Sequence, residues 1–258
     1  MPEHLSLSLH ESVAVLTLQR PPVNALNHAL LRELRDVIGG LAATPARALV
    51  LAAEGRCFSA GLDLFEVFQY PPDEAVAFSR AFDDAVTALF ALELPVVAAL
   101  GGHAIAGGAV LAAAADFRLV ADGDAQLGLT EIRVGVPFPA SAFEIVRCAY
   151  QGPYFAELVY RGRTYGVAEA LARRFVDEVV PPGELAARAL ALAGELAGRP
   201  AIAFSSSKRA LRKEALERMA AARTVDGTDP LWQHWRSPEV LSAMAAYRAS
   251  LRTSASRG

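Results

Sequence analysis

Residues 101–131 read GGHAIAGGAVLAAAADFRLVADGDAQLGLTE, and this stretch decides the expected fold. A glycine pair opens an alanine-rich segment that predicts a helix, a short strand follows, and one acid, Glu131, ends an otherwise uncharged run. The first N–H groups of a helix have no partner within the helix and lie at the positive end of its dipole. Gly107 and Gly108 therefore present backbone donors that no side chain covers, and a developing anion could accept hydrogen bonds from them.

A second turn of small residues lies upstream, after a predicted buried strand over residues 47–53 (RALVLAA). It falls within RCFSAGLD, where Ala60, Gly61 and Leu62 form the tight part of the turn. Two backbone donors that converge on one oxygen would form an oxyanion hole, in which losing one donor lowers the rate roughly a hundred- to thousandfold. Taken singly, each motif is also explained by an ordinary turn without a ligand.

Three motifs resemble, in their order and spacing, the crotonase, or enoyl-CoA hydratase/isomerase, superfamily: RCFSAGLDL at 56–64, GGHAIAGGAVLAAAADFRLVA at 101–121 and LGLTEIRVGVPFP at 127–139. By this resemblance, the backbone N–H groups of Leu62 and Gly107 form an oxyanion hole for the carbonyl of an acyl-CoA thioester. The resemblance also implies that Ala60 lies against the adenine, that Arg56 lies near the CoA phosphates, and that the loop with Asn24 borders the CoA channel. Capping of a turn is the alternative role of Asn24. Coenzyme A is then part of the substrate, and no separate cofactor is expected.

Position 110 departs from the pattern of the hydratases. By the resemblance, enoyl-CoA hydratases carry two catalytic glutamates, and the first stands three residues after the second oxyanion glycine, where this sequence has Val110. The second glutamate is present as Glu131. Hydration needs one group to activate water while another handles the alpha proton, so a valine here removes half of that machinery. A single acid can still take a proton and return it. In having one acid at these positions, the sequence resembles the 3,2-enoyl-CoA isomerases.

The predicted enzyme is therefore an isomerase of fatty acid metabolism that shifts the double bond of a 3-enoyl-CoA to the conjugated 2-enoyl-CoA. Glu131 would carry the proton from the alpha to the gamma carbon, and its apolar neighbours should raise the pKa of its carboxyl group; these are Leu129, Ile132, Val134 and Val136. Three alternatives stay open. They are another crotonase reaction (weak hydration, decarboxylation or thioester hydrolysis), a non-catalytic acyl-CoA-binding protein, and a thioester tethered to a carrier protein.

Aromatic residues that follow the first turn are candidates for the acyl pocket. By the resemblance this region shapes the pocket, so we expect Phe65 and Phe68 to line it, together with Val110 and Phe138. Packing in the core is the alternative role of these side chains. Tyr247 occupies a place where relatives bring an aromatic residue near the acyl pocket.

Composition limits the other possibilities. A chain of 258 residues with 53 % hydrophobic residues and a mean hydropathy of +0.27 can bury a large core. Its formal charge of −3 gives no general attraction to nucleic acid or to an anionic membrane. No apolar run has the length of a transmembrane helix, and the first residues lack the pattern of a signal peptide. Two cysteines and five scattered histidines offer neither a disulfide framework nor a metal site, so we expect a reduced, cytoplasmic protein without a metal.

Strands and helices alternate along most of the chain, which predicts an α/β fold. We expect strands at 5–10, 13–19, 47–53 and 95–100, and helices at 28–41, 73–92 and 108–115. The resemblance implies that these elements form a crotonase-like spiral of ββα repeats. Asp116 and Arg118, at the start of the next strand, are expected to make structural ion pairs and to take no part in catalysis.

Helices follow one another past residue 180, with predicted spans at 182–198, 201–222 and 237–253. We expect residues 1–195 to form the acyl-CoA-binding core and residues 196–258 to form a helical trimerisation region. By the resemblance, this region packs against neighbouring subunits in homotrimers that pair into hexamers. A tail that covers its own active site is the alternative. Trp232 and Trp235 fit either an oligomer contact or the packing of a helix cap.

Overall fold

Two β-sheets organise the chain in the computed structural model, which describes residues 3–225 and 227–255. The larger sheet has six strands in the order β1 (Leu5–His10), β2 (Val13–Leu18), β3 (Ala48–Ala53), β5 (Val96–Leu100), β7 (Phe117–Ala121) and β10 (Glu178–Val180). The smaller sheet has four strands in the order β4 (Cys57–Ser59), β6 (His103–Ile105), β8 (Gln126–Gly128) and β9 (Thr164–Gly166). The β1–β2 and β8–β9 pairs are antiparallel, and the other neighbours are parallel.

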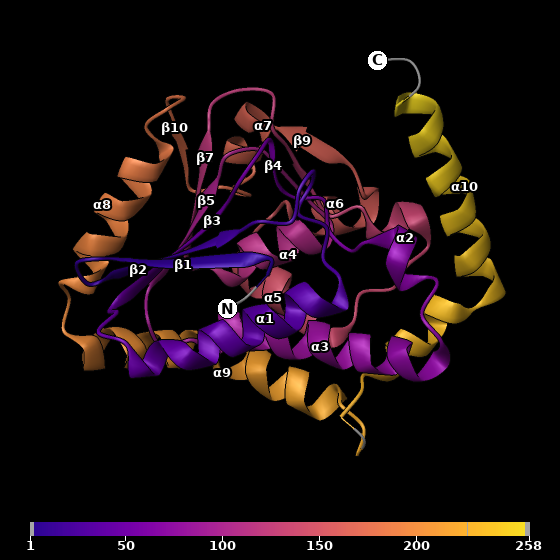
Figure 1. Cartoon of the computed structure of the whole chain (residues 1–258), viewed down its shortest axis with the longest axis horizontal. Coiled ribbons are helices and arrows are strands. Elements are labelled where there is room, and N and C mark those ends of the chain that lie inside the picture. The colour runs from indigo at the N-terminus through magenta and orange to yellow at the C-terminus, as the bar shows by residue number, and fades with distance from the viewer. Residues whose placement is uncertain (1–2, 226, 256–258) are drawn as a thin grey trace.

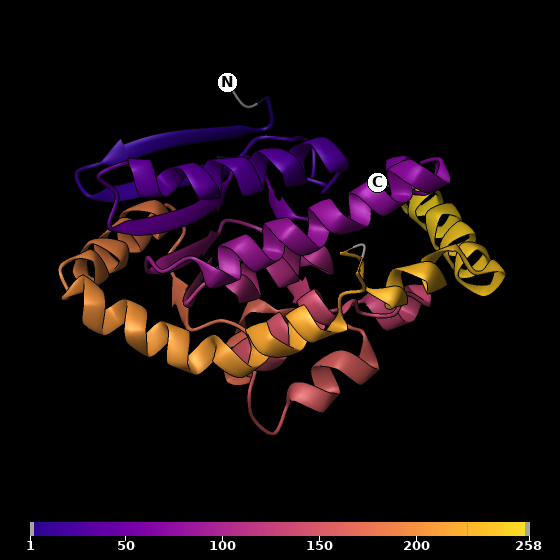
Figure 2. The ribbon, with the colours of Figure 1, turned by 90° about the horizontal axis from the view of Figure 1, so that it is seen from below.

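Helices lie on both faces of the larger sheet (Figure 1). They are α1 (His28–Gly40), α2 (Leu64–Val67), α3 (Pro72–Ala91), α4 (Gly107–Ala114), α5 (Ala140–Ala149), α6 (Phe155–Arg161), α7 (Val167–Ala172), α8 (Leu185–Ala197), α9 (Ala201–Ala222) and α10 (Pro238–Ala255). Three 3-10 segments accompany them: η1 (Leu41–Ala43), η2 (Glu131–Val134) and η3 (Pro230–Arg236). Figure 2 shows α1, α3 and α9 lying across the molecule, with α10 at one end.

The alternation of side chains along β3 divides the core in two. Leu49 and Leu51 point into the main core, to which α1, α3 and α4 contribute side chains. Ala48 and Val50 point toward α8. The face of α8 that meets the sheet carries alanines, Ala189, Ala193 and Ala197, all buried. Because alanine has a short side chain, α8 packs close to the strands and closes this face of the sheet.

A ββα repeat links the two sheets. β3 is followed by β4, β5 by β6 and β7 by β8, so each repeat places its first strand in the larger sheet and its second strand in the smaller one. In the smaller sheet β4, β6 and β8 are parallel neighbours. Their carboxyl ends therefore meet at one edge, which is where parallel sheets bind ligands.

Most predicted elements agree with the structure within a few residues. The hairpin of β1 and β2 is confirmed, and Asn27 caps α1 by accepting a hydrogen bond from the N–H of Leu30 at 3.0 Å. Between α9 and α10, Pro230 starts η3, which the side chain of Asp229 caps. None of the helices within the described part of the chain combines the length and apolar character that crossing a membrane requires.

Candidate active site

The ends of β4, β6 and β8 carry the residues predicted to form the site. Leu62 follows β4, Gly107 follows β6, and Glu131 follows β8. The turns are in direct contact: a Cβ atom built on Gly61 would lie 3.0 Å from the backbone nitrogen of Gly107. Because this glycine has φ +85° and no room for a side chain, the two turns can approach each other only with glycine at this position.

The N–H group of Leu62 faces away from its neighbouring strand. Leu26 and Leu62 form an isolated parallel bridge, in which the N–H of Leu26 donates to the carbonyl of Gly61 at 2.8 Å and the N–H of Asp63 donates to the carbonyl of Leu26 at 3.0 Å. In a parallel bridge of this kind the opposite residue uses neither its N–H nor its carbonyl. The Leu62 donor therefore points away from Leu26, and the adjacent Gly61 lies against the Gly107 turn.

The N–H group of Gly107 is the first of α4, so it has no acceptor within the helix. The preceding residue, Ala106, has φ 51° and ψ −124°, a backbone conformation that residues other than glycine rarely adopt. Such strain is typical of functional sites and here directs the first N–H groups of the helix. A Cβ on Gly108 would lie 2.2 Å from the carbonyl oxygen of Ser59, so the start of α4 lies against the end of β4.

Glu131 begins η2, and only 7 % of its surface is exposed. Its Oε2 atom is buried and has no hydrogen-bond partner among the described residues. Burial raises the pKa of its carboxyl group to about 8, and hydrogen bonds with the backbone of Glu131 and Thr130 oppose this shift. Of the four predicted apolar neighbours, Leu129, Val134 and Val136 are buried, whereas Ile132 is 51 % exposed.

Glu131 and the two turns line one small cavity of about 60 Å³, hereafter the catalytic pocket. Its described lining residues are Ala60, Leu62, Leu64, Ile105, Ala106, Thr130, Glu131, Val134, Val136, Trp235, Met244 and Tyr247. Glu131 is the only acid among them. The remaining side chains are almost all apolar, which explains why the carboxyl group is held in its neutral form at higher pH than usual.

The C-terminal segment of the same chain closes the catalytic pocket. Trp235 comes from η3, and Met244 and Tyr247 come from α10. These residues cover the cavity that holds Glu131, which is the arrangement expected if the tail covers its own active site. Tyr247 was expected near the acyl pocket, Trp235 was expected in an oligomer contact or in the packing of a helix cap, and Met244 was not predicted for this place. One sequence signal could have predicted that Met244 lies beside Tyr247: they are three residues apart, a spacing that places both on one face of a helix.

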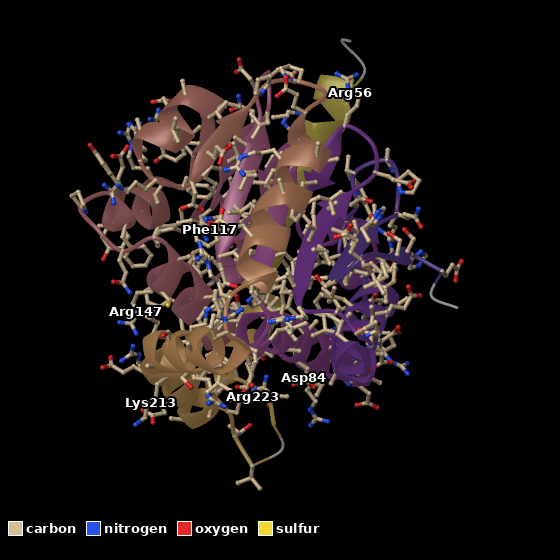
Figure 3. All side chains as sticks on the ribbon, turned by 90° about the vertical axis from the view of Figure 1, so that its left-hand side faces the viewer. Arg56, Asp84, Phe117, Arg147, Lys213 and Arg223 are labelled. Carbon is tan, nitrogen blue, oxygen red and sulfur yellow. The ribbon has the colours of Figure 1, made fainter. Side chains whose placement is uncertain are left out.

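Residues predicted to bind coenzyme A lie in different surroundings. Ala60 lines the catalytic pocket. Arg56 is exposed at one end of the molecule (Figure 3). Asn24 is fully buried: its Oδ1 accepts from the N–H of Arg20 at 2.8 Å, and its Nδ2 donates to the carbonyls of Glu54 and Cys57 at 2.9 and 2.8 Å. These bonds use both amide hydrogens and match the turn-capping alternative.

The four side chains predicted for the acyl pocket are not among the residues that line the catalytic pocket. Val110 is 1 % exposed and packs in the main core, because α4 is buried on all sides. Phe138 packs edge-on against Phe143, with ring centroids 6.2 Å apart. Phe65 is 43 % exposed on α2. Phe68 lines a second, neighbouring cavity.

Structural roles expected for two polar residues agree with the structure. Asp116 pairs with Lys208 and Arg212, and Arg118 pairs with Asp177, each at 2.7 Å. The Nδ1 atom of His103 accepts a hydrogen bond from a backbone N–H at 2.9 Å. Across residues 3–225 and 227–255, no group of three or more His, Cys, Asp or Glu side chains could hold a metal ion.

Known proteins resemble this chain over most of its length. The family model described as enoyl-CoA hydratase/isomerase matches residues 8–238. A protein of Mycobacterium tuberculosis named probable enoyl-CoA hydratase EchA17 is 34 % identical over 218 residues, which are 82 % of each chain. A crotonyl-CoA hydratase of Syntrophomonas wolfei is 32 % identical over 213 residues, which are 81 % of each chain.

Solved structures resemble the chain over nearly its whole length. The human mitochondrial delta3-delta2-enoyl-CoA isomerase superimposes with a TM-score of 0.92 and 25 % identity, covering 98 % of this chain and 99 % of that chain. The chain belongs to the enoyl-CoA hydratase/isomerase family and is an enzyme of that family. The predicted crotonase-like α/β fold is confirmed.

Proposed function

We propose that this enzyme is an isomerase that converts a 3-enoyl-CoA to the conjugated 2-enoyl-CoA. One observation carries the proposal: Glu131 is the only acid among the described residues that line the catalytic pocket. Val110 stands where, by the family pattern, hydratases carry their first glutamate. A pocket with one carboxyl group supports a reaction that removes and returns a single proton.

The reaction begins when the thioester carbonyl accepts hydrogen bonds from the N–H groups of Leu62 and Gly107. These donors stabilise negative charge on the oxygen, so the alpha proton becomes acidic enough for Glu131 to remove. The electron pair of the C–H bond delocalises through the double bond to the gamma carbon. The same carboxyl group, now protonated, donates its proton to that carbon, and the double bond lies in conjugation with the carbonyl.

The raised pKa of Glu131 suits this exchange. A group with a pKa of about 8 is a stronger base than an ordinary carboxylate, and once protonated it is still able to donate. The apolar lining keeps water away from the intermediate. Both properties follow from burial of the carboxyl group under η3 and α10.

Hydration of a 2-enoyl-CoA is the second candidate, because two relatives are named hydratases. It requires a group that holds and activates water beside the beta carbon. The described lining of the catalytic pocket offers Glu131 alone for both proton transfers. We therefore expect wild-type protein to hydrate crotonyl-CoA very slowly, and rapid hydration would contradict the isomerase assignment.

Replacement of Glu131 by glutamine tests the proposed function. Glu131→Gln preserves the shape of the side chain but removes the proton acceptor, so kcat for a 3-enoyl-CoA should fall by about a hundred- to ten-thousandfold. Binding of the acyl-CoA, measured by calorimetry, should change little. Glu217→Gln makes the same change on an exposed position of α9 and serves as the control. Undiminished isomerisation in Glu131→Gln would refute the assignment.

A further inference from the structure

Arg20 joins the two segments that meet at the turn after β4. Its Nη2 atom forms ion pairs with Asp63 at 2.8 Å and with Glu66 at 3.1 Å, and its Nη1 atom donates to the carbonyl of Ala25 at 2.9 Å. The side chains of Arg20 and Asp63 are 21 % and 16 % exposed, so water screens this pair less than a pair on the surface. Within the described part of the chain, Arg20 is the only cation that pairs with either carboxylate.

Asp63 directly follows Leu62, whose N–H group is the first donor of the proposed oxyanion hole. The backbone N–H of Asp63 donates to the carbonyl of Leu26 at 3.0 Å. Its Oδ1 atom caps α2 by accepting from two N–H groups of the first turn, both at 3.1 Å, and its Oδ2 atom accepts from Arg20. The bond from Arg20 is therefore the one contact by which a side chain of another segment holds Asp63.

Glu66 of α2 accepts from two donors besides Arg20. Nδ2 of Asn27 donates to its Oε2 atom at 3.0 Å, and the hydroxyl of Tyr70 donates to its Oε1 atom at 2.6 Å. Because Asn27 also caps α1, Glu66 links α2 to the start of α1. We call the ion pairs of Arg20 with Asp63 and Glu66 the Arg20 clamp.

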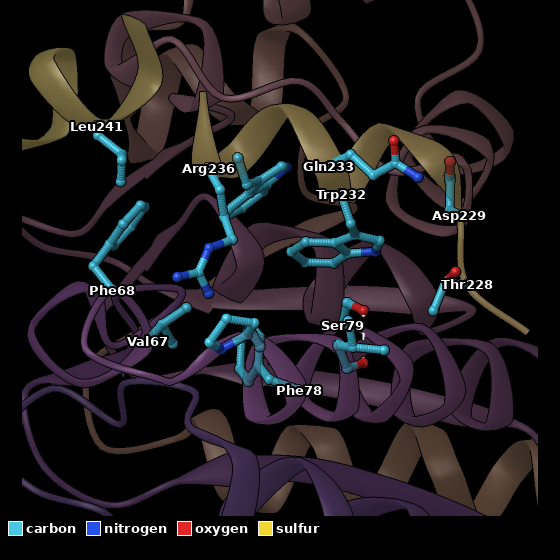
Figure 4. Close-up of a pocket in the computed structure, with 14 residues that line it drawn as sticks. Val67, Phe68, Phe78, Ser79, Thr228, Asp229, Trp232, Gln233, Arg236 and Leu241 are labelled. Carbon is cyan, nitrogen blue, oxygen red and sulfur yellow. Dashed lines mark hydrogen bonds between the residues drawn. The ribbon is translucent and has the colours of Figure 1, made fainter. Parts of the chain in front are cut away.

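Apolar packing alone holds α2 weakly. The helix has four residues, and none of them is buried. Val67 and the adjoining Phe68 line a cavity of about 440 Å³ between α3 and η3, the second chamber, and Figure 4 shows both side chains beside it. Leu64 lines the catalytic pocket, which shares Trp235 with this chamber. Side chains next to a void gain fewer dispersion contacts, so the polar contacts of the Arg20 clamp set the position of α2 and of the turn before it.

We infer that Arg20 is a positioning residue that fixes the direction of the Leu62 N–H group. This inference rests on the proposed function for the role of that donor. Arg20 is not among the described residues that line the catalytic pocket, and it acts through Asp63. An oxyanion hole is effective because its donors are oriented before charge develops on the oxygen. A displacement of about 1 Å lowers the rate about a hundredfold.

Arg20→Met tests the clamp by removing its cation. The carboxylates of Asp63 and Glu66 then repel each other without a shared partner, and the turn shifts. We expect kcat for a 3-enoyl-CoA to fall by about ten- to a hundredfold. KM should change less than about threefold, because the donors matter more to the transition state than to the bound substrate. Arg20→Lys keeps the charge but not the planar fork, so it should restore kcat only in part.

The carbonyl stretching frequency of a bound, unreactive ligand reports on the donors directly. Hydrogen bonds to the oxygen weaken the C=O bond and lower this frequency. We would measure it by difference infrared spectroscopy with butanoyl-CoA that is isotope-labelled at its carbonyl carbon. Wild type should lower the frequency relative to free butanoyl-CoA, and Arg20→Met should return it toward the free value. A residue that only stabilised the fold would lower Tm and leave the frequency of the bound ligand unchanged.

Asp63→Asn tests whether Arg20 acts through Asp63. Asparagine still caps a helix but lacks the charge that pairs with Arg20. The variant should lower kcat and shift the carbonyl frequency like Arg20→Met, and the double variant should be at least about fivefold more active than the product of the two single effects. Asp63→Asn also decides the question if Arg20→Met does not fold.

Arg199→Met is the matched control. Arg199 pairs with Glu195 at 2.7 Å, and their side chains are 60 % and 58 % exposed. Losing this surface pair should leave kcat within about twofold of wild type and the carbonyl frequency unchanged.

The outcomes separate this inference from the proposed function. Wild-type kcat and carbonyl frequency in Arg20→Met and Asp63→Asn would overturn the role of Arg20 even if wild type isomerises 3-enoyl-CoA. A lower kcat with an unchanged frequency would overturn it as well. A frequency that returns toward the free value in Arg20→Met, in a protein that does not isomerise 3-enoyl-CoA, would support the clamp and refute the proposed function, because butanoyl-CoA does not react.

Discussion

A single carboxyl group determines the pH behaviour of the proposed reaction. Glu131 must be ionised to remove the alpha proton, and burial raises its pKa to about 8. We expect kcat/KM to rise roughly tenfold per pH unit below that value and to level off above it. A pH profile of wild-type isomerisation, with circular dichroism as the control for folding, measures this. A flat profile between about pH 6 and 9 would show that this pKa does not govern the reaction.

Gly108, like Gly61, is a position at which closely packed backbone leaves no room for a side chain. Its missing Cβ would lie 2.2 Å from the carbonyl oxygen of Ser59, and backbone cannot move aside as a flexible side chain can. Gly108→Ala should therefore lower the free energy of unfolding by several kcal/mol, on the order of the largest single-residue effects, and abolish activity. Urea denaturation measures the change.

Gly194 provides the matched control. It lies within α8, and apart from the adjoining backbone of this helix and the two neighbouring residues no atom lies within 4 Å of a Cβ built on it. Gly194→Ala should raise the free energy of unfolding by about 0.5–1 kcal/mol, because alanine favours helix more than glycine does. Equal effects of the two substitutions would contradict the steric explanation for Gly108.

At the scale of elements, one partly buried carboxylate joins α9 to the larger sheet. Asp116 precedes β7 and pairs with Lys208 and Arg212, which are 6 % and 7 % exposed. Burial lowers the pKa of Lys208 to about 8 although the nearby Asp116 carboxylate favours its charged form. Asp116→Ala would leave two buried cations unpaired and should lower the free energy of unfolding by about 3–5 kcal/mol.

An exposed ion pair that α9 makes with the segment before β5 is the control for that prediction. Arg209 pairs with Glu93 at 2.8 Å, and their side chains are 60 % and 55 % exposed. Glu93→Ala should change stability by no more than about 1 kcal/mol, since water screens this pair. Thermal denaturation of both variants compares the two, and a larger loss for Glu93→Ala would contradict the argument from burial.

At the scale of the whole molecule, one hollow face carries exposed apolar side chains. A cavity of about 520 Å³ lies between β7 and α9, and its rim carries Phe117 and Leu211, which are 36 % and 79 % exposed. Figure 3 shows Phe117 on this face, with Arg147 and Lys213 closer to one edge. Apolar side chains exposed around a hollow are typical of protein interfaces.

We propose that this face is covered by another copy of the chain in a homotrimer or hexamer. Light scattering should then give a mass of at least three times the 27.3 kDa of one chain. Leu211→Glu places a charge in the interface and should shift the mass toward that of one chain. The matched control is Lys213→Glu, which changes an exposed position of the same helix. A wild-type mass of 27.3 kDa would exclude this assembly.

Long elements of the fold could be predicted from sequence, and the short ones could not. Periodicity predicted α1, α3 and α9, because many residues repeat the same spacing. The strands of the smaller sheet have three residues each, too few to show a period of two. Yet these strands bring Leu62, Gly107 and Glu131 together, so their positions were inferred from motifs and not from periodicity.

The sequence by itself determined the local chemistry of this protein: glycines that permit two tight turns, the start of a helix with free N–H groups, and a single acid where hydratases carry two. Each depends on residues close together along the chain, so neighbouring letters reveal it. Only the tertiary structure decided that Trp235, Met244 and Tyr247 close the catalytic pocket and that a second chamber adjoins it. Trp235, Met244 and Tyr247 lie more than a hundred residues from Glu131 in the sequence. Helix packing brings them together, and no local pattern in the sequence specifies that packing.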